Sequence, residues 1–313
     1  MSKETAVATV PVGIHEGVPE TAYHGRLTGL PAASASILKT LFNRSPEHAA
    51  WDHPQLNPKW EPDAPTDAQI NGTILHSMVL ETPSMYRVLN FDAYRSNEAK
   101  AARDEVVEAG LIPILAHKLE PLTIVADALR RRLARVPNIA KALAEAQKEV
   151  TMIWEERGAL TKCRFDALPP ASFGFALDLK FTGRSAEPEG WGRTLVNEYL
   201  FQAALYPRAV KALRGDTPEM VFVVCETDAP YGVSLHAMDP VLSDLADRRL
   251  NQALATWKDC LAAGKWPGYS SSVHYQEPPP WELARQETRE IRDTMTPGDR
   301  YARLYEAAGG PPS

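Results

Sequence analysis

The most constraining feature of the sequence is the stretch KCRFDALPPASFGFALDLKFTG, residues 162–183, which places charged side chains inside two runs typical of β-strands. Successive side chains of a strand point to opposite faces of the sheet. In FALDLKF, the four large apolar residues therefore share one face, and Asp178 and Lys180 share the other. In KCRFDAL, Asp166 shares its face with Lys162 and Arg164. A hairpin through the Pro-Pro loop would place Asp166 and Asp178 side by side.

Two adjacent carboxylates at these positions need a partner, because they repel each other when both are ionised. A divalent cation between Asp166 and Asp178 removes that repulsion, and Mg²⁺ is usually held by one or two carboxylates together with a substrate phosphate. Lys180 projects to the same side, where an ammonium group can orient or deprotonate a water or stabilise a developing charge. A solvated sheet face with an Asp–Lys pair has the same spacing, so the pattern alone leaves both interpretations open.

The charge balance argues against a protein that binds nucleic acid over its whole surface. The net charge is −6, whereas such proteins are usually basic. A local basic channel is compatible with this balance, and a site that gathers carboxylates around cations fits it well. The candidates for phosphate contacts along such a channel are Lys162, Arg164, Arg184 and Arg193. Each of these alone would also fit an ordinary solvated charge.

Cysteine usage and hydropathy indicate a cytoplasmic protein. Cys163, Cys225 and Cys260 are widely spaced and form no C-x-x-C pair, so a zinc or iron–sulfur site built from cysteines is not supported. Reduced and mostly buried thiols are the expected state. The apolar runs are too short to cross a bilayer, and the N-terminus lacks the apolar core of a secretory signal.

The order of the expected elements indicates an α+β fold. We expect an extended arm over residues 1–33 and a domain over 34–270, with a helical part (34–147) and an α/β core (148–270). The charged residues 271–313 are expected to form a tail or a helical appendage. Helices are expected over residues 34–51, 67–81, 97–109, 114–147, 191–214 and 239–263, with a stop near Ser45 and Pro46 and breaks around Pro113 and Pro137. Five strands are expected within 149–181 and 219–239.

The polar pattern of residues 162–183 resembles the signature of the PD-(D/E)xK nuclease superfamily. That signature is an Asp, a β-hairpin and then Asp-x-Lys, here Asp166 followed by Asp178, Leu179 and Lys180. GTILHSMVLE resembles the helix before the core in the RecB-like branch, and FQAALY resembles the Q-x-x-x-Y helix after the Asp-x-Lys strand. SASILKTLFNRSPEHAAW resembles the opening of the RecE-type exonucleases, known as exonuclease VIII, of phages and prophages.

The resemblance implies a PD-(D/E)xK nuclease core, which is a central mixed β-sheet flanked by helices, with an N-terminal helical elaboration. It also implies two Mg²⁺ ions, for which Mn²⁺ can substitute. The implied metal ligands are His76, Asp166, Asp178 and the backbone carbonyl of Leu179. The implied catalytic residues are Asp166, Asp178, Lys180, Gln202 and Tyr206.

Several of these positions also have simpler interpretations. His76 would fit a satisfied core histidine. Gln202 and Tyr206 are implied to border the site and contact DNA phosphate, but they would equally fit an interior stripe of one helix. Glu149 resembles an acidic position of the family and fits a surface glutamate equally well. Phe181 stands where the RecE-type pattern has Thr, which removes a hydroxyl from a secondary contact.

The function implied by the resemblance is a Mg²⁺-dependent exodeoxyribonuclease that digests linear duplex DNA from 5′ to 3′ and leaves 3′ single-stranded tails for recombination. A ring-shaped homo-oligomer acting at duplex DNA ends is implied as well, with a single-strand annealing protein as partner. Two other functions remain open. The fold could serve as a non-catalytic DNA-binding or assembly module, or an unrelated α+β enzyme could bind a small phosphorylated substrate. Intact Asp166, Asp178 and Lys180 argue against a module that has lost catalysis.

Overall fold

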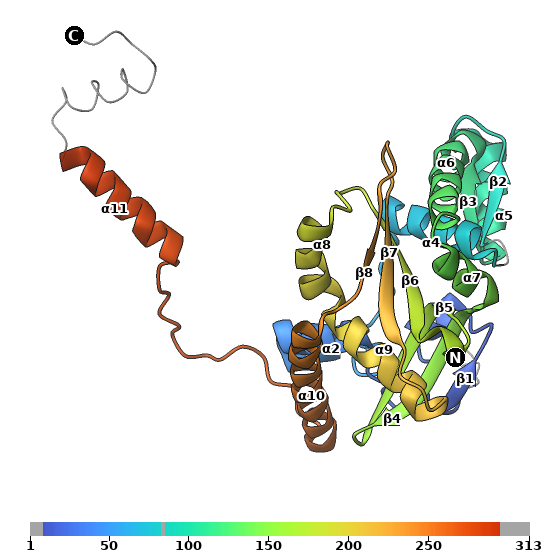
Figure 1. The fold of residues 1–313 in the computed structure, drawn as a ribbon. Coiled ribbons are helices and arrows are strands. Elements are labelled where there is room, and N and C mark those ends of the chain that lie inside the picture. The colour runs from blue at the N-terminus through green and yellow to red at the C-terminus, as the bar shows by residue number, and fades with distance from the viewer. Residues whose placement is uncertain (1–8, 83–84, 295–313) are drawn as a thin grey trace, which may run out of the picture. The chain divides into compact units, whose positions relative to one another are not determined.

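A six-stranded sheet forms the centre of the chain (Figure 1). The computed structural model describes residues 9–82 and 85–294, and the contacts within the chain divide it into two units, Met1–Gly268 and Tyr269–Ser313. The sheet lies in the first unit with the order β1-β4-β5-β6-β7-β8, in which β6 and β7 are parallel and the other neighbours antiparallel. Its strands are β1 (Gly13–His15), β4 (Gln147–Glu156), β5 (Ala159–Leu168), β6 (Phe175–Thr182), β7 (Glu219–Glu226) and β8 (Val233–His236).

Helices cover both faces of this sheet because its central strands carry apolar side chains on both sides. The helices on one face are α2 (Ala35–Asn43), α3 (Pro46–Asp52), α9 (Leu200–Leu213) and α10 (Pro240–Ala263). The helices on the other face are α4 (Asp67–Leu80), α6 (Ala116–Leu133) and α7 (Pro137–Glu145). A central mixed sheet flanked by helices confirms the expected α+β fold.

The β4–β5 hairpin fixes the register of the central strands. It turns at Arg157 and Gly158, whose φ angles of 52° and 80° suit a two-residue turn that matches the twist of the strands. Pairs such as Val150 with Phe165 follow from this turn, so the same register sets Glu149 opposite Asp166. The φ angle of Glu149 is 53°, and the ladder is interrupted at this position.

The next pair of strands, β5 and β6, is joined by only one ladder pair, Ala167 with Leu177. The connection between the strands runs through a short helical turn, η1 (Ala171–Phe173). This register sets Asp166 opposite Asp178, as the sequence predicts. Beyond that point the two described strands form no further ladder pair, and the polar side chains lie where they separate.

The N-terminal segment differs from the expected extended arm. Residues 9–33 fold against the sheet, whereas residues 1–8 lie outside the described part. Strand β1 pairs with β4, and a short helix, α1 (Glu20–His24), follows. Leu27 and Ala32 are buried, and the N–H of Val10 donates to the Leu27 carbonyl at 2.9 Å. The segment therefore belongs to the core of the first unit.

One expected helix ends where the sequence predicts, and another is divided. Within residues 34–51, α2 ends at Asn43, next to the stop expected near Ser45 and Pro46, and a second helix, α3, starts there with Ser45 as its N-cap and Pro46 in its first turn. Within residues 191–214, α8 (Pro188–Thr194) is followed by a π-helical segment, η2 (Leu195–Tyr199), before α9 begins. Such π-helical insertions are often found at functional sites.

A second, two-stranded sheet was not expected. It consists of β2 (Tyr86–Leu89) and β3 (Ile112–Leu115), which pair in parallel on either side of α5 (Asn97–Glu108). Each strand has four residues, too few to establish a period-2 pattern. The helix expected over 114–147 accordingly begins at Ala116, and it is broken at Pro137 as the sequence predicts.

The second unit contains α11 (Pro280–Thr294), an exposed helix whose apolar side chains Trp281, Leu283 and Ile291 face solvent. It accounts for part of the expected tail or appendage, and residues 295–313 of that segment lie outside the described residues. None of the helices that the structure describes is long and apolar enough to span a membrane.

Candidate metal centre

Asp166 and Asp178 face each other at the point where β5 and β6 separate. The N–H of Leu179 donates to Asp166 Oδ2 at 2.7 Å, in the place where a paired strand would offer a backbone carbonyl. The N–H and C=O groups of one strand residue point to the same side, so the Leu179 carbonyl also points toward β5. A side-chain carboxylate and a backbone oxygen therefore share the gap between these strands.

His76 reaches this gap from α4. The start of that helix is fixed by a capping box between Thr66 and Gln69. His76 Nδ1 lies 3.4 Å from Asp166 Oδ2. Its ring meets Phe181 edge-on, with ring centroids 5.4 Å apart. Phe181, which stands in place of the Thr of the RecE-type pattern, thus packs against the imidazole.

Glu149 completes a cluster of three candidate ligands with His76 and Asp166. One ligand atom from each residue lies within 4.8 Å of the others. The cluster forms because the β4–β5 register sets Glu149 opposite Asp166, and because the positive φ of Glu149 redirects its backbone out of the regular ladder. The sequence does contain a signal for Glu149. Counting residues back along both strands from a turn at Arg157 and Gly158 places Glu149 opposite Asp166, which favours a role in the site over a surface position.

The electrostatics of this cluster favour a bound cation. Burial, and next the Asp166 carboxylate, raise the pKa of Glu149 to about 7. Burial and Asp166 also raise the pKa of Asp178 to about 6, against the opposing effect of Lys180. Glu149 and Asp178 are therefore harder to ionise beside Asp166, and a divalent cation among these side chains would remove the repulsion.

Both carboxylate oxygens of Asp178 have a partner in the protein. The side chain is nearly fully buried, and Gln202 Nε2 donates to its Oδ2. Lys180 Nζ forms an ion pair with Oδ1. The buried carboxylate is therefore held between an amide and an ammonium group, beside Asp166.

Lys180 is held beneath aromatic rings. Its Nζ lies 4.7 Å from the centroid of the Tyr199 ring and 5.9 Å from that of Phe222. Tyr199 is the last residue of η2, so the π-helical segment leads directly to this contact. Burial opposes the charge of the lysine, but Asp178 and its other neighbours outweigh burial and raise the pKa of Lys180. The group is therefore an ammonium ion at neutral pH.

The donor set fits a hard divalent cation. It offers the carboxylates of Glu149 and Asp166, the imidazole of His76 and the carbonyl of Leu179, with Asp178 Oδ1 beside them. Oxygen-rich sets of this kind suit Mg²⁺ and Mn²⁺. The sequence prediction of the ligand set omitted Glu149, which the structure adds to it.

The comparisons with known proteins agree with this geometry. Residues 34–279 match the family described as a PDDEXK-like domain of unknown function (DUF3799). The chain belongs to this family. A solved structure from Eubacterium rectale, described as a candidate exonuclease, aligns with a TM-score of 0.50 and 14% sequence identity over 86% of this chain and 98% of that one. At this identity the likeness shows the fold, which is that of the PD-(D/E)xK nuclease superfamily. None of the curated proteins matches.

In this DUF3799 chain, the residues expected on α9 have different surroundings. Gln202 contacts Asp178, next to the candidate metal ligands. Tyr206 is buried instead, with its ring 4.9 Å from that of Phe165, and burial raises the pKa of its hydroxyl well above the usual value. Tyr206 thus lies in the core, where α9 turns it toward the sheet, and its expected contact with phosphate stays a prediction.

The basic residues expected along a DNA channel fall into two groups. Lys162 is buried and donates to the Tyr23 carbonyl at 2.5 Å, and Arg164 donates to another backbone carbonyl of the N-terminal segment at 2.7 Å. In this structure both side chains anchor the N-terminal segment to the sheet, and their contact with DNA phosphate stays a prediction. Arg184 and Arg193 are exposed, and for them the contact with DNA stays a prediction.

Proposed function

We propose that this chain is a divalent-cation-dependent exodeoxyribonuclease that acts on linear duplex DNA. The observation that carries the proposal is the convergence of three carboxyl side chains with His76 and Lys180 where β5 and β6 separate. Buried carboxylates that repel one another are costly to a fold, and such arrangements mark functional sites. Membership of a PDDEXK-like family supports the same chemistry.

The residues of the chain would divide the reaction between them. Glu149, Asp166 and His76, with the Leu179 carbonyl, would hold Mg²⁺, which supplies Lewis-acid polarisation of the phosphate and lowers the pKa of a bound water. The Leu179 N–H and Gln202 keep the two aspartates in place. The Lys180 ammonium orients the attacking water and stabilises the charge that develops on the phosphate.

The finer features of the proposal follow the RecE-type resemblance. We propose digestion from 5′ to 3′, which leaves 3′ single-stranded tails, by a ring-shaped oligomer of phage or prophage origin. A second Mg²⁺ beside Asp178 would stabilise the leaving 3′ oxygen, as in two-metal nucleases. The partner would be a single-strand annealing protein that receives the tail.

The test is digestion of linear duplex DNA that carries a label at either the 5′ or the 3′ end. Wild type and Lys180→Ala are compared in Mg²⁺ and in EDTA, with Lys211→Ala, an exposed lysine of α9, as the matched control. The proposal predicts early release of the 5′ label in Mg²⁺, which Lys180→Ala abolishes and Lys211→Ala retains. Folded protein that binds duplex DNA and releases neither label would refute the exonuclease and leave a binding module.

A further inference from the structure

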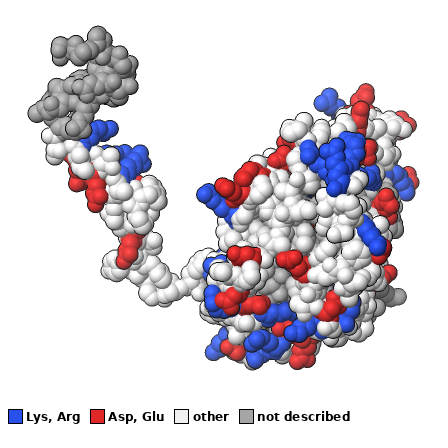
Figure 2. Space-filling model, in the orientation of Figure 1, with Lys and Arg blue, Asp and Glu red and all other residues white. Residues whose placement is uncertain are grey.

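The C-terminal turn of α6 and the residue stretch after it carry a concentration of positive charge. Four arginines fall within six positions, and residues 128–136 (ALRRRLARV) contain no acidic residue. Blue side chains gather over the region of α4 and α6 on the face seen in Figure 2. We call these four residues the arginine cluster: Arg130, Arg131, Arg132 and Arg135.

Most of this charge has no counter-ion. Arg130 pairs with Asp127 at 3.0 Å. For Arg131, Arg132 and Arg135, no ion pair is found within the part of the chain that the structure describes. All three side chains are exposed. The Arg132 guanidinium also attracts the Glu226 carboxylate. Guanidinium groups so close together repel one another, and a further anionic partner would stabilise them.

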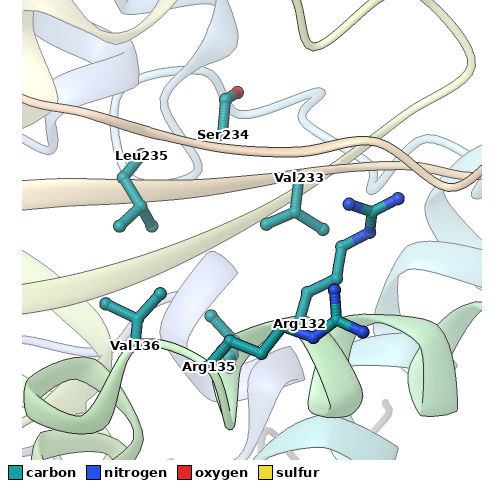
Figure 3. A pocket seen from close by; sticks show the side chains of 7 residues that line it. Arg132, Arg135, Val136, Val233, Ser234 and Leu235 are labelled. Atoms are coloured by element: carbon teal, nitrogen blue, oxygen red, sulfur yellow. The ribbon is translucent and has the colours of Figure 1, made fainter.

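Two of these arginines line a hollow between α6 and the edge strand β8. Figure 3 shows the guanidinium groups of Arg132 and Arg135 on one side of the hollow, with the apolar side chains of Val136, Val233 and Leu235 around the rest. Arg132 donates a hydrogen bond to the Pro230 carbonyl at 3.2 Å, and among the described residues no other hydrogen bond of this guanidinium is found, so further donors can reach a ligand. The hollow thus offers planar, fork-shaped donors that match phosphate oxygens.

A simpler explanation is that basic residues stabilise the C-terminus of α6, where the helix dipole is negative. That effect falls off within the last turn, and Arg135 lies beyond the end of the helix at Leu133. Stabilisation of the helix dipole also gives no reason for Arg132 and Arg135 to line a hollow together with β8. The helix dipole therefore accounts for part of the cluster but not for its position.

The cluster lies beside the candidate metal centre. Arg130 donates to the Met78 carbonyl on α4, two residues after His76. Across the sheet, Phe181 pairs with Cys225 and Cys225 with Val233, so the hollow lies two strands from the phenylalanine that packs on His76. At about 4.8 Å per strand, the β8 backbone beside the hollow is about 10 Å from β6, and the metal centre lies at the far edge of β6. A phosphate bound at the hollow would therefore lie at least about three base pairs from the metal centre, at about 3.4 Å along one DNA strand.

We propose that the arginine cluster binds the phosphate backbone of duplex DNA a few base pairs from the end that lies in the metal centre. This inference rests on the proposed function, since it takes DNA as the substrate. The cluster would then position the duplex through Arg132 and Arg135 without taking part in bond cleavage. Contacts of this kind are insensitive to sequence and strongly dependent on salt.

The experiment compares wild type with the double variant Arg132→Gln, Arg135→Gln. The matched control is Lys211→Gln, Lys258→Gln, which removes the same charge from exposed positions of α9 and α10. Binding of a fluorescent duplex is measured in EDTA as a function of KCl, and cleavage is measured on duplex DNA and on thymidine 5′-(p-nitrophenyl phosphate). Arg132→Lys, Arg135→Lys is included in case the glutamine variant does not fold.

The slope of log K against log[KCl] is negative for DNA binding. The proposal predicts that it becomes less negative by about 2 in the glutamine variant, at about 0.9 for each lost phosphate contact. It further predicts a raised KM on duplex DNA with kcat unchanged, unchanged cleavage of the small substrate, and wild-type behaviour of the control and lysine variants. A salt slope equal to that of wild type would overturn the proposal, as would an equal loss of cleavage on both substrates. If the glutamine variant shows the less negative slope but wild type cleaves neither substrate, the result would refute the nuclease and leave the DNA-binding surface standing.

Discussion

Replacing Glu149 by Gln should stabilise the cation-free protein at neutral and alkaline pH. In the folded protein the pKa of Glu149 is raised from its ordinary 4.5 to about 7, first by burial and then by Asp166. Glu149 binds its proton more tightly in the folded protein than in the unfolded chain. The ionised side chain therefore destabilises the fold, and the free energy of unfolding falls as the pH rises from 4.5 to about 7. At about 1.4 kcal/mol for each pH unit, the penalty above pH 7 is about 3 kcal/mol.

The assay is urea denaturation in EDTA across pH 5 to 8, with Glu155→Gln, an exposed glutamate of the same strand, as the matched control. We expect Glu149→Gln to approach the stability of wild type near the acidic end and to exceed it by about 2–3 kcal/mol at the alkaline end. Glu155→Gln should show no such pH-dependent difference. Adding Mn²⁺ should reverse the order, because the cation stabilises wild type by mass action and the variant has lost a ligand.

A difference between Glu149→Gln and wild type that stays constant across this pH range would refute the electrostatic reasoning. So would a variant that is less stable than wild type at the alkaline end in EDTA. Either result would mean that the Glu149 carboxylate is not held among other negative charges, and would remove the main reason for placing a cation beside it.

Three further predictions follow from other contacts. Asp178→Asn should abolish cleavage and lower the melting temperature in EDTA at neutral pH, because the change leaves the buried Lys180 ammonium without its carboxylate partner; a melting temperature equal to or above that of wild type would contradict this. Lys162→Met should leave cleavage unchanged. Because burial lowers the pKa of Lys162 to about 8, the free energy of unfolding of wild type should rise between about pH 8 and 10.5, which urea denaturation at pH 8 and 10 checks. A chain that ends at Gly268 should unfold with the melting temperature of the full chain, since the two units have largely separate contacts; a clear decrease in a calorimetric scan would contradict the division.

The apposition of Asp166 and Asp178 could be predicted from sequence because it depends on local order alone. A period-2 pattern assigns the faces, and a short loop between two strands fixes which positions meet. The helix that carries His76 could be predicted for a similar reason, since its apolar spacing and the Thr66 capping box are local signals.

Glu149 was undecided because its role depends on the register of a different pair of strands and on a positive φ, which a non-glycine residue rarely adopts. The anchoring contacts of Lys162 and Arg164 could not be predicted for a related reason. Nothing in their own strand shows that a segment about 140 residues earlier folds over them, as the bond from Lys162 to the Tyr23 carbonyl demonstrates. The π-helical turn that brings Tyr199 over Lys180 likewise leaves no clear trace in the apolar periodicity of residues 191–214.

The account rests on the claim that the polar side chains between β5 and β6 bind a divalent cation. The most direct test is a calorimetric titration of Mn²⁺ into wild type and into Asp166→Asn. This variant removes the negative charge of the carboxylate that lies beside His76 and Glu149 and accepts the hydrogen bond of the Leu179 N–H. Saturable binding to wild type that Asp166→Asn loses is the predicted result. Equal binding to both proteins, or none to wild type that is folded, would contradict the claim.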